Sequence, residues 1–367
     1  MASSTQSYGR QVWLQLKKNK AAFVSLILIV FAALLSVFGY LLAPDNSPYA
    51  DLQTVEIQAR NPGYRQMFLK IPLQHQAEEK NLFQRIFYGS PPGFSYLPIN
   101  AYTLGRDSIA VQKFVDEDTS VLQHYAISQI VKSPAEIKNN IVTKTYWLGT
   151  DAFGRDILSR IIIGTRVSLS VGLISVLISL LIGTTLGAIA GYFRGRIDDA
   201  IMWLVNVTWS IPTLLLVFAF TLAMGKGFWQ IFIAVGLTMW VSVARLVRGQ
   251  VLAIRELEYV QAARALGFTN SRIIIKHILP NILGPLLVIA AGNFATAIII
   301  EAGLSFLGIG VQPPQPSWGL MIKENYNFII THHPTLALIP GFAIMMMVLA
   351  FNLLGNGLRD AVDVKQQ

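Results

Sequence analysis

Hydrophobic residues occur in six long runs along the chain, and the segments between the runs carry nearly all of the charge. The runs cover residues 21–43, 169–190, 202–224, 228–244, 282–300 and 336–354. About 20 consecutive apolar residues cross the roughly 30 Å hydrocarbon core of a bilayer as a helix. The pattern therefore predicts an all-α, polytopic membrane protein with six transmembrane helices.

The first run predicts an uncleaved helix that follows a cytoplasmic tail of residues 1–20. It holds 23 residues and is preceded by Lys17, Lys18 and Lys20. A cleavable signal peptide has an apolar region of about 7–15 residues followed by a small-x-small site. This run is too long for one, and the sequence up to Pro44 is a poor cleavage site.

Composition supports a chain that lies mainly in lipid. Of its 367 residues, 53% are hydrophobic and only 13% are charged, whereas soluble domains carry about 25% charged residues. The absence of cysteine excludes disulfides, cysteine metal sites and thiol catalysis. A net charge of +9 in a soluble protein would suggest nucleic-acid binding.

The positions of Lys and Arg along the chain indicate that the net charge of +9 reflects membrane topology. Basic residues in short loops mark the cytoplasmic side of a membrane protein. With a cytoplasmic N-terminus, the inside segments hold 14 basic residues and the two short outside loops hold one each, Lys226 and Lys323. The count predicts cytoplasmic termini, an extracytoplasmic segment over residues 44–166, and no nucleic-acid partner.

The segment over residues 44–146 differs in composition from the rest of the chain. Eight of the 16 prolines lie in it. Tyr64–Pro72 and Ile141–Tyr146 have strand-like patterns, and Ser120–Val131 has a helix-like one. We expect a small α+β insert between the first two transmembrane helices, with an irregular proline-rich loop as the alternative.

Small residues recur at every fourth position through the second apolar run. This spacing places them on one helix face and lets another helix approach closely. The residues predicted to pack in this way are Ser175, Ser179, Gly183, Gly187 and Gly191.

Polar and aromatic residues inside the runs are candidates for lining a translocation pathway, with hydrogen bonding between helices as the alternative. These candidates are Asn206, Trp209, Asn293 and Thr296. No Asp, Glu, Lys, Arg or His lies deep in any run, whereas ion-coupled carriers usually need such a residue or a broken helix. We therefore expect an energy source outside this chain.

The loop over residues 245–280 contains six basic residues and two helix-like stretches. Arg255–Leu266 predicts a short helix that Gly267 ends in a left-handed conformation, and one of residues 269–271 caps a second helix. Tyr259, Ala262, Ala263 and Leu266 share one face of the first helix, which suits docking into a partner's groove. A surface helix on anionic lipid is an alternative. A DNA-binding helix-turn-helix is disfavoured because the loop is held between two membrane spans.

Part of this loop resembles the EAA loop of ABC-importer permeases. The matching residues are Gln261-Ala-Ala, Gly267 and Leu279-Pro280. Three further blocks, residues 147–160, 304–319 and 351–361, resemble the C-type permease of dipeptide and oligopeptide importers. The chain departs from the family pattern at three positions: Gln261 replaces Glu, His277 replaces Ile and Asn356 replaces Asp.

The resemblance implies a type I importer permease, with residues 147–363 as its core. The loop over 255–280 would then be the coupling segment that docks onto a separate ATPase. The residues that the resemblance and the helix pattern assign to coupling are Tyr259, Gln261, Ala262, Ala263, Arg264, Leu266, Gly267 and Pro280.

The implied partners are a second homologous permease in a heterodimer, two ATPases that bind ATP and Mg, and an extracytoplasmic binding protein. This chain lacks the G-x-x-x-x-G-K-[ST] phosphate loop, so we expect neither an enzyme nor a cofactor in it. The implied cargo is a di- or oligopeptide, with a nickel chelate or glycopeptide as alternatives. A secondary transporter that works alone and an exporter subunit or scaffold are the rival classes.

Residues near the outer ends of the spans are expected to gate the pathway or contact the binding protein, with a structural cap as the alternative. The candidates are Asp151, Arg155, Asp156, Gln312 and Trp318. His332 and His333 predict a solvated pair and no metal site, since no other Cys or His lies near them in the sequence.

Overall fold

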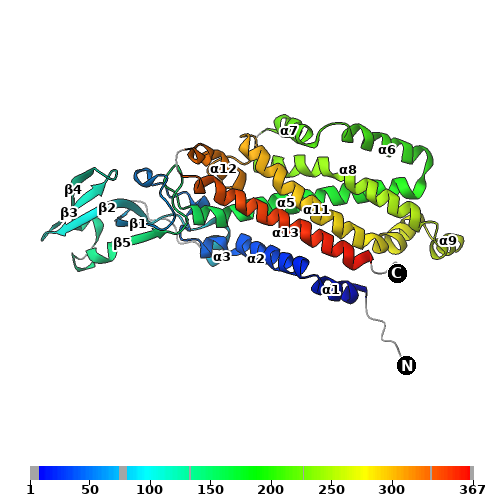
Figure 1. The fold of residues 1–367 in the computed structure, drawn as a ribbon, viewed down its shortest axis with the longest axis horizontal. Coiled ribbons are helices and arrows are strands. Elements are labelled where there is room, and N and C mark those ends of the chain that lie inside the picture. Colours follow the sequence, from blue (N-terminus) through cyan, green and yellow to red (C-terminus); the bar gives the residue numbers. More distant parts are fainter. Residues whose placement is uncertain (1–7, 74–80, 132–133, 226, 331–332, 364–367) are drawn as a thin grey trace, which may run out of the picture. The chain divides into compact units, whose positions relative to one another are not determined.

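The computed structural model describes residues 8–73, 81–131, 134–225, 227–330 and 333–363, and the chain divides into two units. The helical unit comprises residues 1–33, 168–312 and 342–367, and the sheet unit comprises residues 34–167 and 313–341. Three helices have residues in both units (Figure 1): α2 (Lys20–Leu42), α5 (Ile157–Phe193) and α13 (Thr335–Asp363).

Five stretches of helix in the described chain are long and apolar enough to cross a membrane. They are α2, α5, α8 (Phe228–Ile254), residues 270–306, which end in α11 (Leu283–Phe306), and α13. The helix α1 (Tyr8–Lys18) precedes α2 and is separated from it by Asn19.

The run over residues 202–224 forms two helices in place of the single helix predicted. These are α6 (Gly195–Trp209) and α7 (Thr213–Met224), which are bent by 91° relative to one another. Pro212 lies at the bend; proline has no N–H to donate, and it disfavours helical backbone at the residue before it. The predicted count of six spans is reached only if this bent pair makes one crossing.

Four helices extend beyond the apolar runs that predicted them. Thus α5 begins at Ile157 rather than residue 169, α8 continues to Ile254 rather than 244, α11 continues to Phe306, and α13 continues to Asp363. Hydropathy marks only the lipid-like part of a helix, whereas its backbone hydrogen bonds continue into polar sequence. The predicted loop over residues 245–280 therefore starts as helix.

The helix α5 packs closely on α8 through its row of small residues. A Cβ atom placed on Gly183, Gly187 or Gly191 would lie 2.5–2.8 Å from a backbone carbonyl oxygen of α8. One and two turns earlier, Ser179 and Ser175 are fully buried, and Ser175 Oγ donates to the Phe232 carbonyl at 3.1 Å. The two backbones can approach this closely only where α5 has no larger side chain.

The helix α13 packs within the helical unit along α11 and the start of α2. The rings of Phe294 and Phe351 stack at 4.0 Å with an interplanar angle of 13°. A Cβ atom on Gly357 would lie 2.2 Å from Ala22 Cβ. Figure 1 shows α5, α8, α11 and α13 running side by side in this unit.

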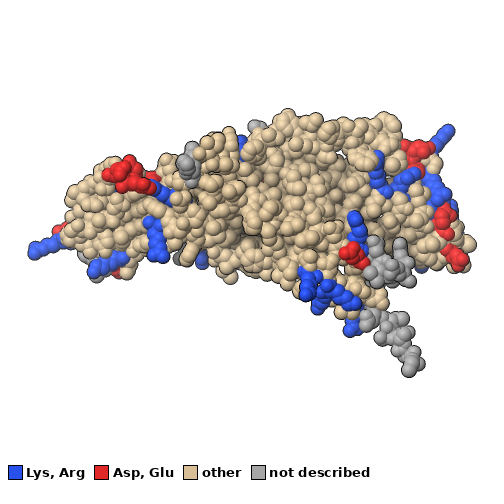
Figure 2. All heavy atoms as spheres, in the orientation of Figure 1, with Lys and Arg blue, Asp and Glu red and all other residues tan. Residues whose placement is uncertain are grey.

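Figure 2 shows how charge is distributed over the helical unit. The surface along the middle of its helices is nearly free of charged side chains, whereas Lys and Arg gather near α1 and the end that carries α9 (Glu258–Ala265). A nearly uncharged surface along the helices next to a basic end suits a protein that spans a bilayer.

The sheet unit is built on five antiparallel strands in the order β4-β3-β2-β1-β5. Their bounds are Tyr64–Pro72 (β1), Phe94–Leu104 (β2), Ser108–Phe114 (β3), Ser120–Ala126 (β4) and Ile141–Tyr146 (β5). The adjacent residues Phe68 and Leu69 face opposite sides of β1 and both are fully buried. Both faces of the sheet are therefore covered around β1.

Short helices complete the sheet unit. They are η1 (Pro48–Ala50), η2 (Val55–Ile57), α3 (Leu82–Tyr88), α4 (Ile127–Ile130), η3 (Pro134–Asn140), α12 (Trp318–Asn325) and η6 (Tyr326–Ile329). The predicted strands Tyr64–Pro72 and Ile141–Tyr146 are confirmed. The predicted helix over 120–131 is wrong: most of it is β4, which pairs along its whole length with β3. Only Ile127–Ile130 is helical.

The close contact between α5 and α8 gives a first prediction. Gly187→Ala places a methyl group 2.5 Å from the Ala244 carbonyl oxygen, so the helices must separate, at a cost of about 1–3 kcal/mol. We expect a lower thermal unfolding temperature for the purified chain in detergent. The control is Gly249→Ala in α8, where no atom lies within 4 Å; a drop of equal size in the control would contradict the contact.

Candidate functional site

The segment between α8 and α11 forms a series of short helical turns in the helical unit. After α9 come α10 (Asn270–Ile273), a π-helical turn η4 (Ile274–Ile278) and a 3₁₀ turn η5 (Leu279–Ile282). The first helix begins at Glu258 rather than at the predicted Arg255. Gly267 has φ of +77°, the left-handed conformation predicted for it, and Thr269 is the N-cap residue of α10.

One side of α9 is packed and the other is exposed. Val260 and Ala263 are only 3% and 5% exposed. Tyr259 and Leu266 are 43% and 74% exposed, and Ala262 is also exposed. The prediction that Ala263 shares the free face is therefore wrong, because the helix is anchored through Ala263. The exposed face consists of Tyr259, Ala262 and Leu266, which we call the α9 outer face.

The packed side of α9 joins a hydrophobic cluster drawn from α5, α8 and the turns before α11. Its buried members are Ala188, Tyr192, Val243, Val247, Val251, Val260, Ala263, Ile273, Ile278 and Ile282. A helix of eight residues is too short to be stable alone, so this cluster is what fixes α9 in place.

Polar contacts hold the same segment to the end of α5. An Arg255 guanidinium nitrogen donates to the Tyr192 carbonyl, and the Tyr192 hydroxyl bonds to Asn270 Oδ1 at 2.9 Å. Arg194 pairs with Glu256 at 2.7 Å. Both flanks of α9 are therefore tied to one helix end.

The other residues assigned to coupling lie on the surface. Arg264 and Pro280 are exposed, and Gln261 Nε2 donates to the Arg255 carbonyl at 3.1 Å. A Glu at this position could not donate that bond. Gln261, which stands where the family pattern has Glu, thus donates a hydrogen bond to the turn that precedes α9.

Two of the four pathway candidates meet at α8. The Arg245 guanidinium lies 3.2 Å from the centre of the Trp209 ring, and its Nη2 donates to Asn206 Oδ1 at 2.8 Å. One turn further along α8, Arg248 makes a bidentate pair with Asp198 at 2.5 and 2.7 Å. Sequence reasoning missed Arg245 as their partner because the residue falls just beyond the predicted end of its span.

The other two candidates lie on α11 and differ from one another. Asn293 is 8% exposed and its Nδ2 has no partner among the described residues, whereas Thr296 is exposed and donates to the Gly292 carbonyl at 3.0 Å. Within the described chain, no hydrogen bond joins these residues to Asn206. The structure therefore does not bring the four candidates into one site.

A buried carboxylate lies within α11, one residue beyond the apolar run predicted for it. Glu301 is fully buried and accepts hydrogen bonds from Ser168 Oγ at 3.1 Å and Ser305 Oγ at 2.8 Å. Hydropathy alone places Glu301 outside the span because the apolar run ends at Ile300, whereas the helix continues to Phe306.

Three of the predicted gate residues are buried in the sheet unit. Asp151, Arg155 and Asp156 are 1%, 2% and 5% exposed. Arg155 Nε donates to Asp151 Oδ2 at 2.7 Å, its Nη1 to Asp51 at 3.1 Å and its Nη2 to Glu324 at 2.6 Å. Their predicted role as a contact surface is wrong in this conformation, and the structural cap is supported instead.

The remaining gate candidates are also packed. Trp318 is 2% exposed and donates to the Ile161 carbonyl at 3.2 Å. Gln312, in the helical unit, is half-buried and donates to the Gly310 carbonyl at 2.8 Å. Neither residue offers its polar group to a partner.

Sequence reasoning missed the other members of this buried charge network. Asp51 and Glu324 pair with Arg155, and the fully buried Arg160 donates to Glu324 at 3.1 Å. Glu324 is 169 residues from Arg155 in the chain, so no local spacing could have paired them.

No group of three or more metal-ligating side chains occurs among the residues that the structure describes. His333 Nδ1 lies 3.1 Å from Asn61 Oδ1. His332 and Lys226, both named in the sequence predictions, lie outside the described residues.

Comparison with protein-family models gives two matches. The model described as "binding-protein-dependent transport system inner membrane component" matches residues 183–366, and that described as "N-terminal TM domain of oligopeptide transport permease C" matches residues 7–60. The two matches cover the first apolar helix and the part of the predicted permease core from residue 183 onward.

Curated relatives and a solved structure are similar to this chain. The glutathione transport system permease protein GsiD of Pectobacterium atrosepticum is 44% identical over 61% of this chain and 74% of its own. The dipeptide transport system permease protein DppC of Alkalihalophilus pseudofirmus is 45% identical over 60% and 73%. A chain of the inward-facing MetNI methionine ABC transporter aligns at a TM-score of 0.46 with 19% identity, over 55% of this chain and 95% of that one. No argument rests on that structural likeness.

The buried charge network gives a second prediction. Glu324→Gln leaves Arg155 and the fully buried Arg160 without a shared carboxylate, and breaking such a network costs about 3–5 kcal/mol. We expect a clear loss of thermal stability in detergent. Glu117→Gln is the matched control because Glu117 pairs with Arg60 at the surface, its side chain 77% exposed, where a pair contributes at most about 1 kcal/mol. Equal stability of the two variants would contradict a stabilising role for the network.

Proposed function

Because the chain belongs to the family of binding-protein-dependent transport system inner membrane components, we propose that it is the permease subunit of an ATP-driven peptide importer. Members of this family are transport permeases and not enzymes. The chain is accordingly a multi-pass membrane protein with the type I importer permease fold. It would form half of the translocation pathway, and a second homologous permease would form the other half.

The proposed cargo is a di- or oligopeptide. Relatives of this chain are named for the transport of glutathione, dipeptides and oligopeptides, all of which are short peptides. The chain covers about three quarters of each relative, at 41–45% identity. An extracytoplasmic binding protein would deliver the peptide to the permease pair.

The observation that carries the coupling proposal is the two-sided packing of α9. Its inner side, Val260 and Ala263, is held in the core, and its outer face leaves Tyr259 and Leu266 exposed. An anchored helix that exposes apolar side chains beside polar ones such as Gln261 and Arg264 suits a groove on a partner protein. We propose that the partner is one of two ATPases, which bind ATP and Mg in place of this chain.

The anchoring of α9 suggests how movement would pass to the membrane helices. ATP can drive a change only by favouring one of two states of the ATPase pair. Since α9 is tied to α5 through Arg255 and Tyr192 and packs on α8 through a shared cluster, a shift of α9 would move both helices. The tight seam between α5 and α8 would make them move as one body.

The bend between α6 and α7 is a reasonable place for the pathway. Broken helices in membrane proteins occur where the freed backbone groups face a cavity or other protein. Asn206 and Trp209 lie at the end of α6 next to this bend and contact Arg245. We propose these three residues as part of the pathway lining.

The proposed orientation places both termini in the cytoplasm and residues 44–166 outside. It follows from 14 basic residues on one side against two in the short loops of the other. The α9 segment then faces the cytoplasm, where an ATPase would meet it.

Replacing Gly267 tests the coupling role. Gly267 has φ of +77° and no atom within 4 Å of an added Cβ, so Gly267→Val acts through backbone strain alone. We expect uptake of a labelled dipeptide, measured in cells that co-express the partner subunits, to fall about tenfold or more. Gly267→Asn should retain most uptake because Asn tolerates this conformation.

Co-purification separates loss of coupling from loss of folding. The Val variant should insert in the membrane at wild-type level but retain less ATPase on an affinity column. Wild-type uptake by Gly267→Val would overturn the coupling assignment. Uptake by the purified chain in liposomes without any ATPase would establish a secondary transporter instead.

Single cysteines test the orientation in a chain that has no cysteine. Ser108→Cys and Ser271→Cys place near-isosteric thiols at exposed positions in β3 and α10. A membrane-impermeant maleimide should label Ser108→Cys, but not Ser271→Cys, in right-side-out vesicles, and both after detergent is added. The reverse labelling pattern would invert the topology.

A further inference from the structure

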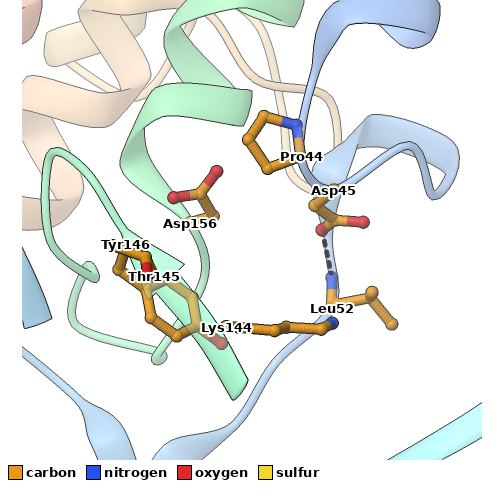
Figure 3. Close-up of a pocket in the computed structure, with 7 residues that line it drawn as sticks. All are labelled: Pro44, Asp45, Leu52, Lys144, Thr145, Tyr146 and Asp156. Carbon is orange, nitrogen blue, oxygen red and sulfur yellow. Dashed lines mark hydrogen bonds between the residues drawn. The ribbon is translucent and has the colours of Figure 1, made fainter. Parts of the chain in front are cut away.

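A cavity of about 190 Å³ lies within the sheet unit, between the end of α2, strand β5 and the start of α5. It is lined by Pro44, Asp45, Leu52, Lys144, Thr145, Tyr146 and Asp156 (Figure 3). None of these residues belongs to the proposed coupling segment or to the proposed pathway lining. The cavity has charges of both signs next to aromatic and aliphatic side chains.

One carboxylate oxygen in the cavity wall lacks a partner. Asp156 is 5% exposed, and its Oδ2 accepts from the Ser159 amide at 2.9 Å and from the Ser159 hydroxyl. Its Oδ1 is buried and has no hydrogen-bond partner among the described residues. Burial raises the pKa of Asp156. A buried acceptor left without a hydrogen bond destabilises the fold, and a donor in the cavity would remove that cost.

One ammonium group also lines the cavity without an ion-pair partner in the described chain. The Lys144 side chain is partly buried, and its Nζ lies 3.3 Å from the centre of the Tyr96 ring. Burial lowers the pKa of Lys144 to about 8. The ring face provides only part of what the ammonium loses in leaving water.

The third charge in the cavity is already satisfied. Asp45 Oδ1 accepts from the Ser47 amide at 2.9 Å, and its Oδ2 accepts from the Leu52 amide at 3.2 Å, the bond drawn in Figure 3. The unmet groups are therefore one anionic oxygen, Asp156 Oδ1, and one cationic nitrogen, Lys144 Nζ. A simple cation or a simple anion would satisfy only one of them.

We propose that this cavity binds a small zwitterion that carries a primary ammonium and a carboxylate, the chemistry of a free amino acid. The ammonium donates to Asp156 Oδ1 and the carboxylate accepts from Lys144 Nζ. The remaining atoms lie against Tyr146, Leu52 and Pro44. The size is suitable, since a cavity of about 150 Å³ is enough to hold benzene.

Binding is tested with the purified full-length chain in detergent by isothermal titration calorimetry. The probes are glycine, L-alanine and L-leucine, with 3-methylbutylamine and 4-methylpentanoate as analogues of leucine that lack the carboxylate and the ammonium. We expect saturable binding of at least one amino acid, with leucine at least tenfold tighter than either analogue. Titration of the chain alone separates this result from the proposed transport function.

Two variants and a matched control locate the binding site. Asp156→Asn keeps an oxygen for the Ser159 bonds but turns a donor toward the cavity, and Lys144→Met keeps the aliphatic stem without the charge. Each should weaken amino-acid binding at least tenfold. Lys138→Met is the control, because Lys138 is exposed in η3 and does not line the cavity; it should leave binding unchanged.

If a variant does not fold, protection of the Lys144 amine from acylation tests the same site in the wild-type chain. In the wild-type chain, the bound amino acid should slow modification of Lys144 by acetic anhydride more than that of Lys70. The ratio of the two rates is measured by mass spectrometry, because the free amino acid also consumes the reagent. Three results would overturn the proposal. The first is no saturable binding of any amino acid, which would mean that water fills the cavity. The others are equal affinity for leucine and both analogues, and unchanged binding in folded Asp156→Asn and Lys144→Met.

Discussion

Hydrocarbon offers no hydrogen-bond partner, and this constraint explains most of the helical unit. Every backbone polar group in the membrane must be satisfied within a helix, and every polar side chain must find a protein partner. Glu301 finds two serine hydroxyls, and Ser175 finds the Phe232 carbonyl. Where no polar partner is involved, close backbone packing supplies the contact, as at Gly187 against α8. Small residues on α5 are therefore as necessary to this unit as its large apolar residues.

The same constraint explains why the α9 segment is built differently from the membrane helices. Outside lipid, a short helix can leave one side open, provided that the other side is fixed. Val260 and Ala263 fix it by packing, and Arg255 fixes it through the Tyr192 carbonyl. The helix α9 is therefore held firmly against the ends of α5 and α8, so its exposed face is connected to these helices through direct contacts. Such a connection is what the proposed coupling to a separate ATPase requires.

The sequence was informative wherever one physical property dominated. Long apolar runs predicted the membrane helices, the four-residue spacing of Ser175 to Gly191 predicted a packing face, and a left-handed Gly267 followed from its place after a helical pattern. Prediction failed where distant residues decide the outcome. The strand β4 depends on pairing with β3, and the buried charge network depends on Glu324, which no local pattern connects to Arg155. The predicted helix ends were wrong for a related reason: Glu301 is hydrogen-bonded to serines and Arg248 is paired with Asp198, and both residues lie in helices that continue past their apolar runs.

The pairing of β1 with β5 bears on how this protein came to have its sheet. Tyr64 and Tyr146 are direct register partners, so the chain enters and leaves the strand region at neighbouring points, about 5 Å apart. A strand pair that closes the segment in this way allows the length between its ends to change with little effect on the path of the chain on either side. The segment is still tied to that chain, because Glu117 pairs with Arg60 before it and the Phe87 carbonyl accepts from Arg166 after it.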